Sequence, residues 1–144
     1  MAKMTEFEIN GKKIELYYNV AATLGISELC GGDIGNLPKL LENNTVEGQL
    51  KLICAILCEL ANGAVALHNT NISFGLETGE RKPEFTADFF LAQCGIEDIN
   101  NAFSTCLEAM GIGSEFTVPD NVKTVEEDID LAEIEAEKNE SKKS

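Results

Sequence analysis

The dipeptide Asn10-Gly11 constrains the fold of this chain most strongly, because it predicts a two-residue hairpin turn and with it a fixed strand register. Both central positions of a type I′ turn need a positive φ angle, which Asn and Gly adopt at little cost. Folding the chain there pairs Glu8 with Lys13 as one cross-strand ion pair of a hairpin spanning residues 5–18. The other face of the hairpin is apolar and carries Phe7, Ile9, Ile14, Leu16 and Tyr18. Since an isolated hairpin is only marginally stable in water, we expect this face to pack on helices.

Residues 46–67 predict the main helix of the fold. Thr45 is expected to cap its N-terminus, because apolar residues recur behind it at steps of three and four. The apolar stripe comprises Val46, Leu50, Ile53, Leu57, Leu60, Ala64 and Leu67, and the other side carries Lys51, Glu59 and Asn62. Polar residues interrupt the stretch, so no membrane-spanning segment is expected.

The remaining elements are shorter. An apolar stripe predicts a second helix over residues 96–110. Two further helices are expected to follow the capping residues Asn19 and Thr86. Residues 33–41 predict a loop or a few turns of helix, and the alternation within residues 72–76 predicts a short strand or an extended loop.

The charge of the chain bears on its partners and on its division into a domain and a tail. Its 144 residues include 25 acidic and 11 basic ones, a net charge of −14, which argues against binding to nucleic acid or to anionic membranes. We therefore predict an α+β, mainly helical domain over residues 1–118, with the N-terminal β-hairpin packed on a small helical core. Residues 119–144 carry nine acids and four lysines and predict an acidic C-terminal tail, flexible or conditionally helical. Within it, residues at helical steps are predicted to contact a partner: Val122, Val125, Ile129 and Ala132.

The chemistry-bearing residues are few. Five cysteines, with no apolar run behind Lys3, predict a cytosolic protein whose thiols stay reduced. Cys54 and Cys58 lie one helical turn apart, but zinc takes about four N/S ligands and the sequence has no second pair of that kind. His68, the only histidine, is expected near the end of the main helix, so nucleophilic or acid–base chemistry would depend on one imidazole. We expect no catalytic residue, no cofactor and no metal ion.

The chain resembles the tail assembly chaperones of long-tailed, siphovirus-type bacteriophages and prophages. The likeness lies in the strand and turn at residues 7–12, in the strand-to-helix step at residues 16–22 and in the helical body that follows. The resemblance implies a non-catalytic protein of the bacterial host cytoplasm, absent from the mature virion. Such a protein binds the tape-measure protein, keeps it soluble and helps recruit the tail-tube protein. It also implies a possible homo-oligomer and a longer, frameshifted product, for which the lysine pair 142–143 offers an A-rich slippery site.

Three alternatives stay open at this point. The net charge also fits an acidic DNA mimic or inhibitor of phage origin. A small cytosolic enzyme would need His68 within hydrogen-bond reach of a thiol. A minor tail or connector protein of the virion would share the composition.

Overall fold

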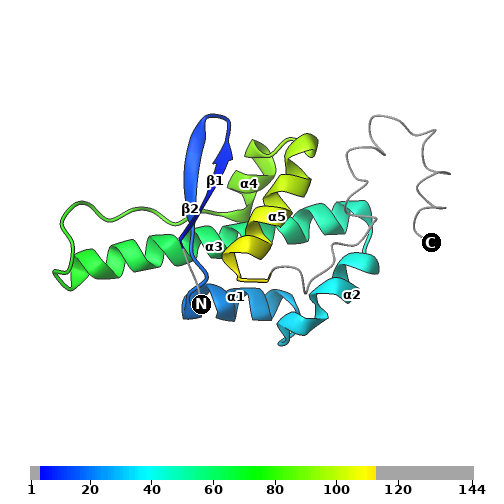
Figure 1. The fold of residues 1–144 in the computed structure, drawn as a ribbon, viewed down its shortest axis with the longest axis horizontal. Coiled ribbons are helices and arrows are strands. Elements are labelled where there is room, and N and C mark those ends of the chain that lie inside the picture. The colour runs from blue at the N-terminus through cyan, green and yellow to red at the C-terminus, as the bar shows by residue number, and fades with distance from the viewer. Residues whose placement is uncertain (1–3, 113–144) are drawn as a thin grey trace.

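The long helix α3 forms the axis of the molecule, and most other elements pack along it (Figure 1). The computed structural model describes residues 4–112. The helices and strands in chain order are β1 (Thr5–Ile9), β2 (Lys12–Leu16), α1 (Val20–Leu29), α2 (Leu37–Glu42), α3 (Val46–Ser73), α4 (Ala87–Gln93) and α5 (Ile99–Ala109), with 3-10 turns at Ile34–Asn36 and Ile96–Asp98. The protein is therefore α+β and mainly helical, with an N-terminal hairpin on a helical core, as predicted. The boundary at residue 118, the tail 119–144 and its four predicted contact residues lie outside the described residues.

The hairpin has the predicted turn and register. Asn10 and Gly11 take φ angles of 50° and 74°, and Glu8 lies opposite Lys13. The two side chains do not close the expected ion pair, which is unsurprising because an exposed pair of this kind gains little over hydration. The inner face is buried at Phe7, Ile9, Ile14 and Leu16, while Tyr18 is half-buried. β1 packs on α5 and β2 packs on α3, so the hairpin covers the core as expected.

Helix α3 begins where the sequence predicted and ends later. The Thr45 hydroxyl accepts a hydrogen bond from the Gly48 N–H at 3.0 Å. The helix continues to Ser73, so the strand or extended loop predicted for residues 72–76 is wrong at its start. Gly75, with a φ of 74°, ends the helix, and the N–H of Leu76 returns to the Asn71 carbonyl at 2.7 Å. That bond is the signature of a glycine-terminated helix end, which outweighed the short alternation.

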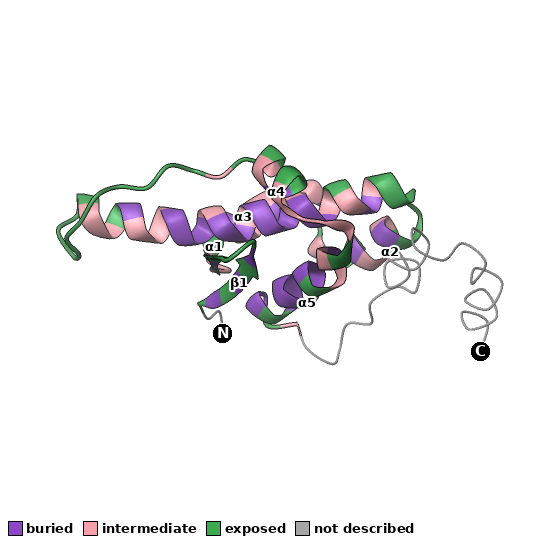
Figure 2. Cartoon of the chain, turned by 90° about the horizontal axis from the view of Figure 1, so that it is seen from above, coloured by how far each residue is buried: buried purple, intermediate pink, exposed green. Residues whose placement is uncertain are grey.

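The burial of side chains around α3 differs from the predicted division into an apolar and a polar side. Its middle is buried or half-buried on every side, whereas Val46 at its start is 40% exposed (Figure 2). Glu59 and Asn62, assigned to the polar side, are half-buried because other segments cover them. Gln49, which no stripe included, is 1% exposed and donates from Nε2 to the Leu41 carbonyl at 2.6 Å.

The remaining helices follow their caps. Asn19 Oδ1 accepts from the Ala22 N–H at 3.0 Å and starts α1, and Thr86 caps α4 in the same manner. The predicted segment 96–110 is confirmed as a 3-10 turn that continues into α5. α1 turns Ala22 into the core and leaves two large side chains outside, Val20 at 75% and Leu24 at 66% exposure.

Candidate interaction site

The C-terminal end of α3 projects past the hairpin and α1, and the chain returns beside it (Figures 1 and 2). We call residues 66–76 the arm and residues 77–86 the strap. At 1.5 Å per residue the 28 residues of α3 span about 42 Å. The strap has no regular secondary structure up to residue 86 and is mostly exposed, so water can satisfy much of its backbone and side chains of α3 satisfy the rest.

Two asparagines of α3 hold the strap. Asn62 donates from Nδ2 to the Phe85 carbonyl at 2.9 Å, and its Oδ1 accepts from the Phe85 N–H at 2.7 Å. Asn69 makes the same pair of bonds with the Lys82 backbone, at 2.9 and 2.7 Å. Each side-chain amide thus presents a donor and an acceptor to one residue, as a neighbouring β-strand would.

The spacing of Asn62 and Asn69 explains why both side chains can reach the strap backbone. Asn62 and Asn69 are seven residues apart, which is about 10.5 Å along a helix. Lys82 and Phe85 are three residues apart, which is about 10 Å along an extended chain. The two repeats coincide, so the strap runs parallel to the helix axis. The i, i+7 pair of asparagines was visible in the sequence, but its partner segment carries no periodic signal.

His68 also contacts the strap. Its Nε2 lies 2.8 Å from the Glu80 carbonyl oxygen, and its Nδ1 lies 3.3 Å from Glu77 Oε2. Arg81 reaches back to the Asn69 carbonyl at 3.3 Å and to the Ser73 hydroxyl. Because α3 continues to Ser73, His68 lies within the helix instead of at its end, and both ring nitrogens face the strap and not a thiol.

The arm presents large apolar side chains at its tip. Phe74 is 79% exposed and Leu76 is 78% exposed, and Ile72 beside them is half-buried. A phenylalanine and a leucine held in water on a braced projection have no role in the core. Exposed apolar groups gathered in this way are typical of protein–protein contact sites.

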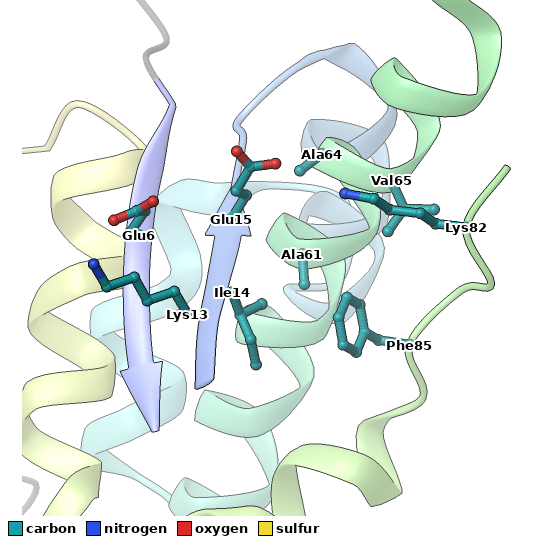
Figure 3. A pocket seen from close by; sticks show the side chains of 9 residues that line it. All are labelled: Glu6, Lys13, Ile14, Glu15, Ala61, Ala64, Val65, Lys82 and Phe85. Atoms are coloured by element: carbon teal, nitrogen blue, oxygen red, sulfur yellow. The ribbon is translucent and has the colours of Figure 1, made fainter. Parts of the chain in front are cut away.

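A groove lies between β2, α3 and the strap (Figure 3). It encloses about 260 Å³ and is lined by Glu6, Lys13, Ile14, Glu15, Ala61, Ala64, Val65, Lys82 and Phe85. Small side chains of α3 form its floor and the Phe85 ring forms part of one wall. Its rim carries charges of both signs.

The thiols lie in the core and at its border. Cys58 donates to the Phe85 carbonyl at 3.5 Å, and burial raises the pKa of its thiol to about 11. A hydrogen bond between Cys54 and Cys94 raises the pKa of Cys94, and burial raises the pKa of Cys106. Among residues 4–112 no group of histidine, cysteine or carboxylate side chains is arranged to hold a metal ion. Cys54 and Cys58 pack in the core, as the sequence favoured.

Glu59 gives the fold a pH dependence with a definite sign. Burial raises the pKa of its carboxyl above the ordinary value of 4.5, and the charges of Glu28 and Glu84 raise it further. The folded state therefore binds this proton more tightly than the unfolded state, so ionisation of Glu59 destabilises the fold as pH rises above that value.

We expect Glu59→Gln to stabilise the protein at neutral pH by about 0.5 kcal/mol, a small amount because the carboxyl is partly hydrated. Urea unfolding from about pH 4 to about pH 7 should show this gain fading as the pH falls and Glu59 is protonated in the wild type. The control is Glu47→Gln, which removes an exposed carboxylate 3.5 Å from Lys51 and should bring no gain. If Glu59→Gln stabilised the protein equally at every pH in this range, the raised pKa of Glu59 would be contradicted.

Comparison of the chain with protein-family models, with curated proteins and with solved structures finds no match. By length and composition alone, α3 is the one helix of the described part that could cross a membrane, and 56% of its most apolar window is buried inside this fold. Residues 4–112 therefore form an α+β domain in which a β-hairpin packs on helices and one arm projects.

Proposed function

We propose that this protein is a non-catalytic assembly chaperone that binds an apolar helical partner through the arm tip. The partner is the tape-measure protein of a long-tailed phage or prophage, and the complex helps to recruit tail-tube subunits in the host cytoplasm. The observation that carries the binding role is the exposure of Phe74 and Leu76 on a segment held in place by the strap. The identity of the partner rests on the resemblance of the sequence to tail assembly chaperones.

The physical logic is that of a soluble cover for an insoluble chain. A long protein with apolar helical stripes aggregates before assembly, because its stripes have nothing else to bury against. A chaperone needs apolar contacts to hold such a helix and net charge to keep the complex dissolved. The exposed arm tip offers the apolar contacts, and the net charge of −14 keeps the complex dissolved.

Co-expression with the tape-measure protein tests the proposal. The wild-type chain should keep that protein in the soluble fraction and co-purify with it. The double variant Phe74→Asp, Leu76→Asp should lose at least nine-tenths of the co-purified partner, since charged side chains cannot be desolvated against an apolar helix. Both side chains are exposed, so the variant should unfold at the same urea concentration as the wild type.

The matched control is the double variant Val20→Asp, Leu24→Asp, which changes an equally exposed apolar pair on α1. It should retain the partner. If the wild-type chain leaves the partner insoluble, the proposed function is wrong. If the two double variants bind equally well, the arm tip is not the contact site.

A further inference from the structure

The outer edge of β2 is open to a further strand. In a hairpin closed by a two-residue turn, the pair flanking the turn is hydrogen-bonded and the pairs then alternate. The register therefore turns the N–H and C=O of Lys13 and Glu15 away from β1. Within residues 4–112, neither backbone makes a hydrogen bond to any element outside the hairpin. Both residues line the groove of Figure 3.

The groove beside this edge has the form of a strand site. Its floor is made by Ala61 and Ala64 of α3, whose short side chains keep the helix surface low. Phe85 stands on the far side, held by Asn62. A strand laid here would run beside β2, with one side chain pointing down between Ile14 and the floor and its neighbours pointing out to solvent.

The charges on the rim define what that strand carries. Glu6 and Glu15 lie directly opposite each other on the outer face, a like-charge pair that costs stability. Lys13 extends across the hairpin on the side of Glu6, and Lys82 points its ammonium toward β2 (Figure 3). Within residues 4–112, no cationic side chain forms an ion pair with Glu15. A cation on an added strand, opposite Glu15, would relieve the repulsion.

A lone extended segment fits the groove better than a second copy of this chain. Another copy pairing through its own β2 would bring its own α3 and strap into the space that α3 and the strap occupy here. A single strand brings no second layer. The net charge of −14 also opposes self-association and favours a segment with a cation.

We propose that the β2 edge binds an extended segment of a partner protein by strand addition. The segment carries a basic residue opposite Glu15, an apolar residue over Ala61 and Ala64, and an acidic residue opposite Lys13. An antiparallel strand satisfies these positions in the order basic, apolar, acidic, and antiparallel pairing is the more stable arrangement. This site is separate from the arm tip and does not depend on the proposed chaperone function.

The test is a titration of the ¹⁵N-labelled full chain with the capped peptide Thr-Thr-Lys-Val-Glu-Thr-Thr, followed by amide NMR shifts. The amide protons of Lys13 and Glu15 should move downfield as they gain acceptors. Those of Glu6 and Glu8, which point to the opposite edge, should not move. N-methylation of the peptide lysine, whose N–H faces β2, should weaken binding at least tenfold. N-methylation of the peptide valine, whose N–H points away, should weaken it much less.

Two further controls separate strand addition from binding by charge alone. A peptide with the lysine and glutamate exchanged should bind at least fivefold more weakly. The variant Glu15→Lys should lose affinity for the original peptide while the protein becomes no less stable, because the introduced ammonium would face the Glu6 carboxylate. Unchanged amide shifts at Lys13 and Glu15 with millimolar peptide, or equal affinities for the two N-methylated peptides, would overturn the proposal.

Discussion

Replacing Gly63 with alanine is expected to lower the free energy of unfolding by about 2–3 kcal/mol, although alanine is the better helix former. Gly63 lies where the end of β2 and the start of α1 cross α3. A Cβ at this position would run into the Tyr17 carbonyl oxygen and would lie 2.8 Å from Asn19 Oδ1. The obstacle is backbone, so it cannot rotate away as a side chain could.

The surrounding hydrogen bonds fix that backbone. The Tyr17 N–H donates to the Leu60 carbonyl at 3.0 Å, and Asn19 Nδ2 donates to the Gly63 carbonyl at 2.9 Å. Relief of the clash would therefore require breaking the contacts that join the hairpin to α3. Urea unfolding followed by circular dichroism measures the loss.

Gly25→Ala is the matched control for this prediction. Its Cβ would meet only the carboxylate end of Glu59, which can turn toward solvent. The substitution should be neutral or stabilise the protein by up to about 1 kcal/mol through helix propensity. If Gly63→Ala were as stable as Gly25→Ala, the close approach of the Tyr17 backbone to α3 would be wrong.

The double variant Asn62→Ala, Asn69→Ala is expected to release the strap and to destabilise the protein by about 2–6 kcal/mol. It removes four hydrogen bonds to the backbone of Lys82 and Phe85. Each is worth about 0.5–1.5 kcal/mol where the freed groups can hydrate. Trypsin cleavage after Arg81 should become at least tenfold faster, because that bond lies in the strap and the strap is then free to enter the protease.

Asn71→Ala provides the comparison. Its Nδ2 reaches Glu77 Oε1 at 3.3 Å on the exposed side of the arm, and its loss should change neither stability nor cleavage appreciably. Equal cleavage rates for the wild type and the Asn62, Asn69 double variant would show that these asparagines do not hold the strap. A released strap should also weaken any contact made by the arm tip, since ordering Phe74 and Leu76 would then oppose binding.

The amino-acid sequence does not predict burial that arises where one segment covers another. Asn62 and Glu59 have the polarity of a solvated helix face, and only the path of the strap and of α1 makes them half-buried. The alternation at residues 72–76 predicted a short strand or an extended loop, but within residues 4–112 no strand lies beside this segment, and the glycine at 75 ends a helix instead. His68 was placed near a helix end because α3 was predicted to stop about six residues too early.

The amino-acid sequence alone determined the hairpin turn, its register, the caps at Asn19, Thr45 and Thr86, and the central stripe of α3. These features depend on residues within a few positions of one another, so local conformational preference and periodicity are sufficient. Only the tertiary structure decided that the strap lies against Asn62 and Asn69, that the arm tip is exposed and that, among residues 4–112, no third strand pairs with β2. Those outcomes depend on which distant segments meet. The irregular strap has no periodic sequence pattern from which its packing position could be predicted.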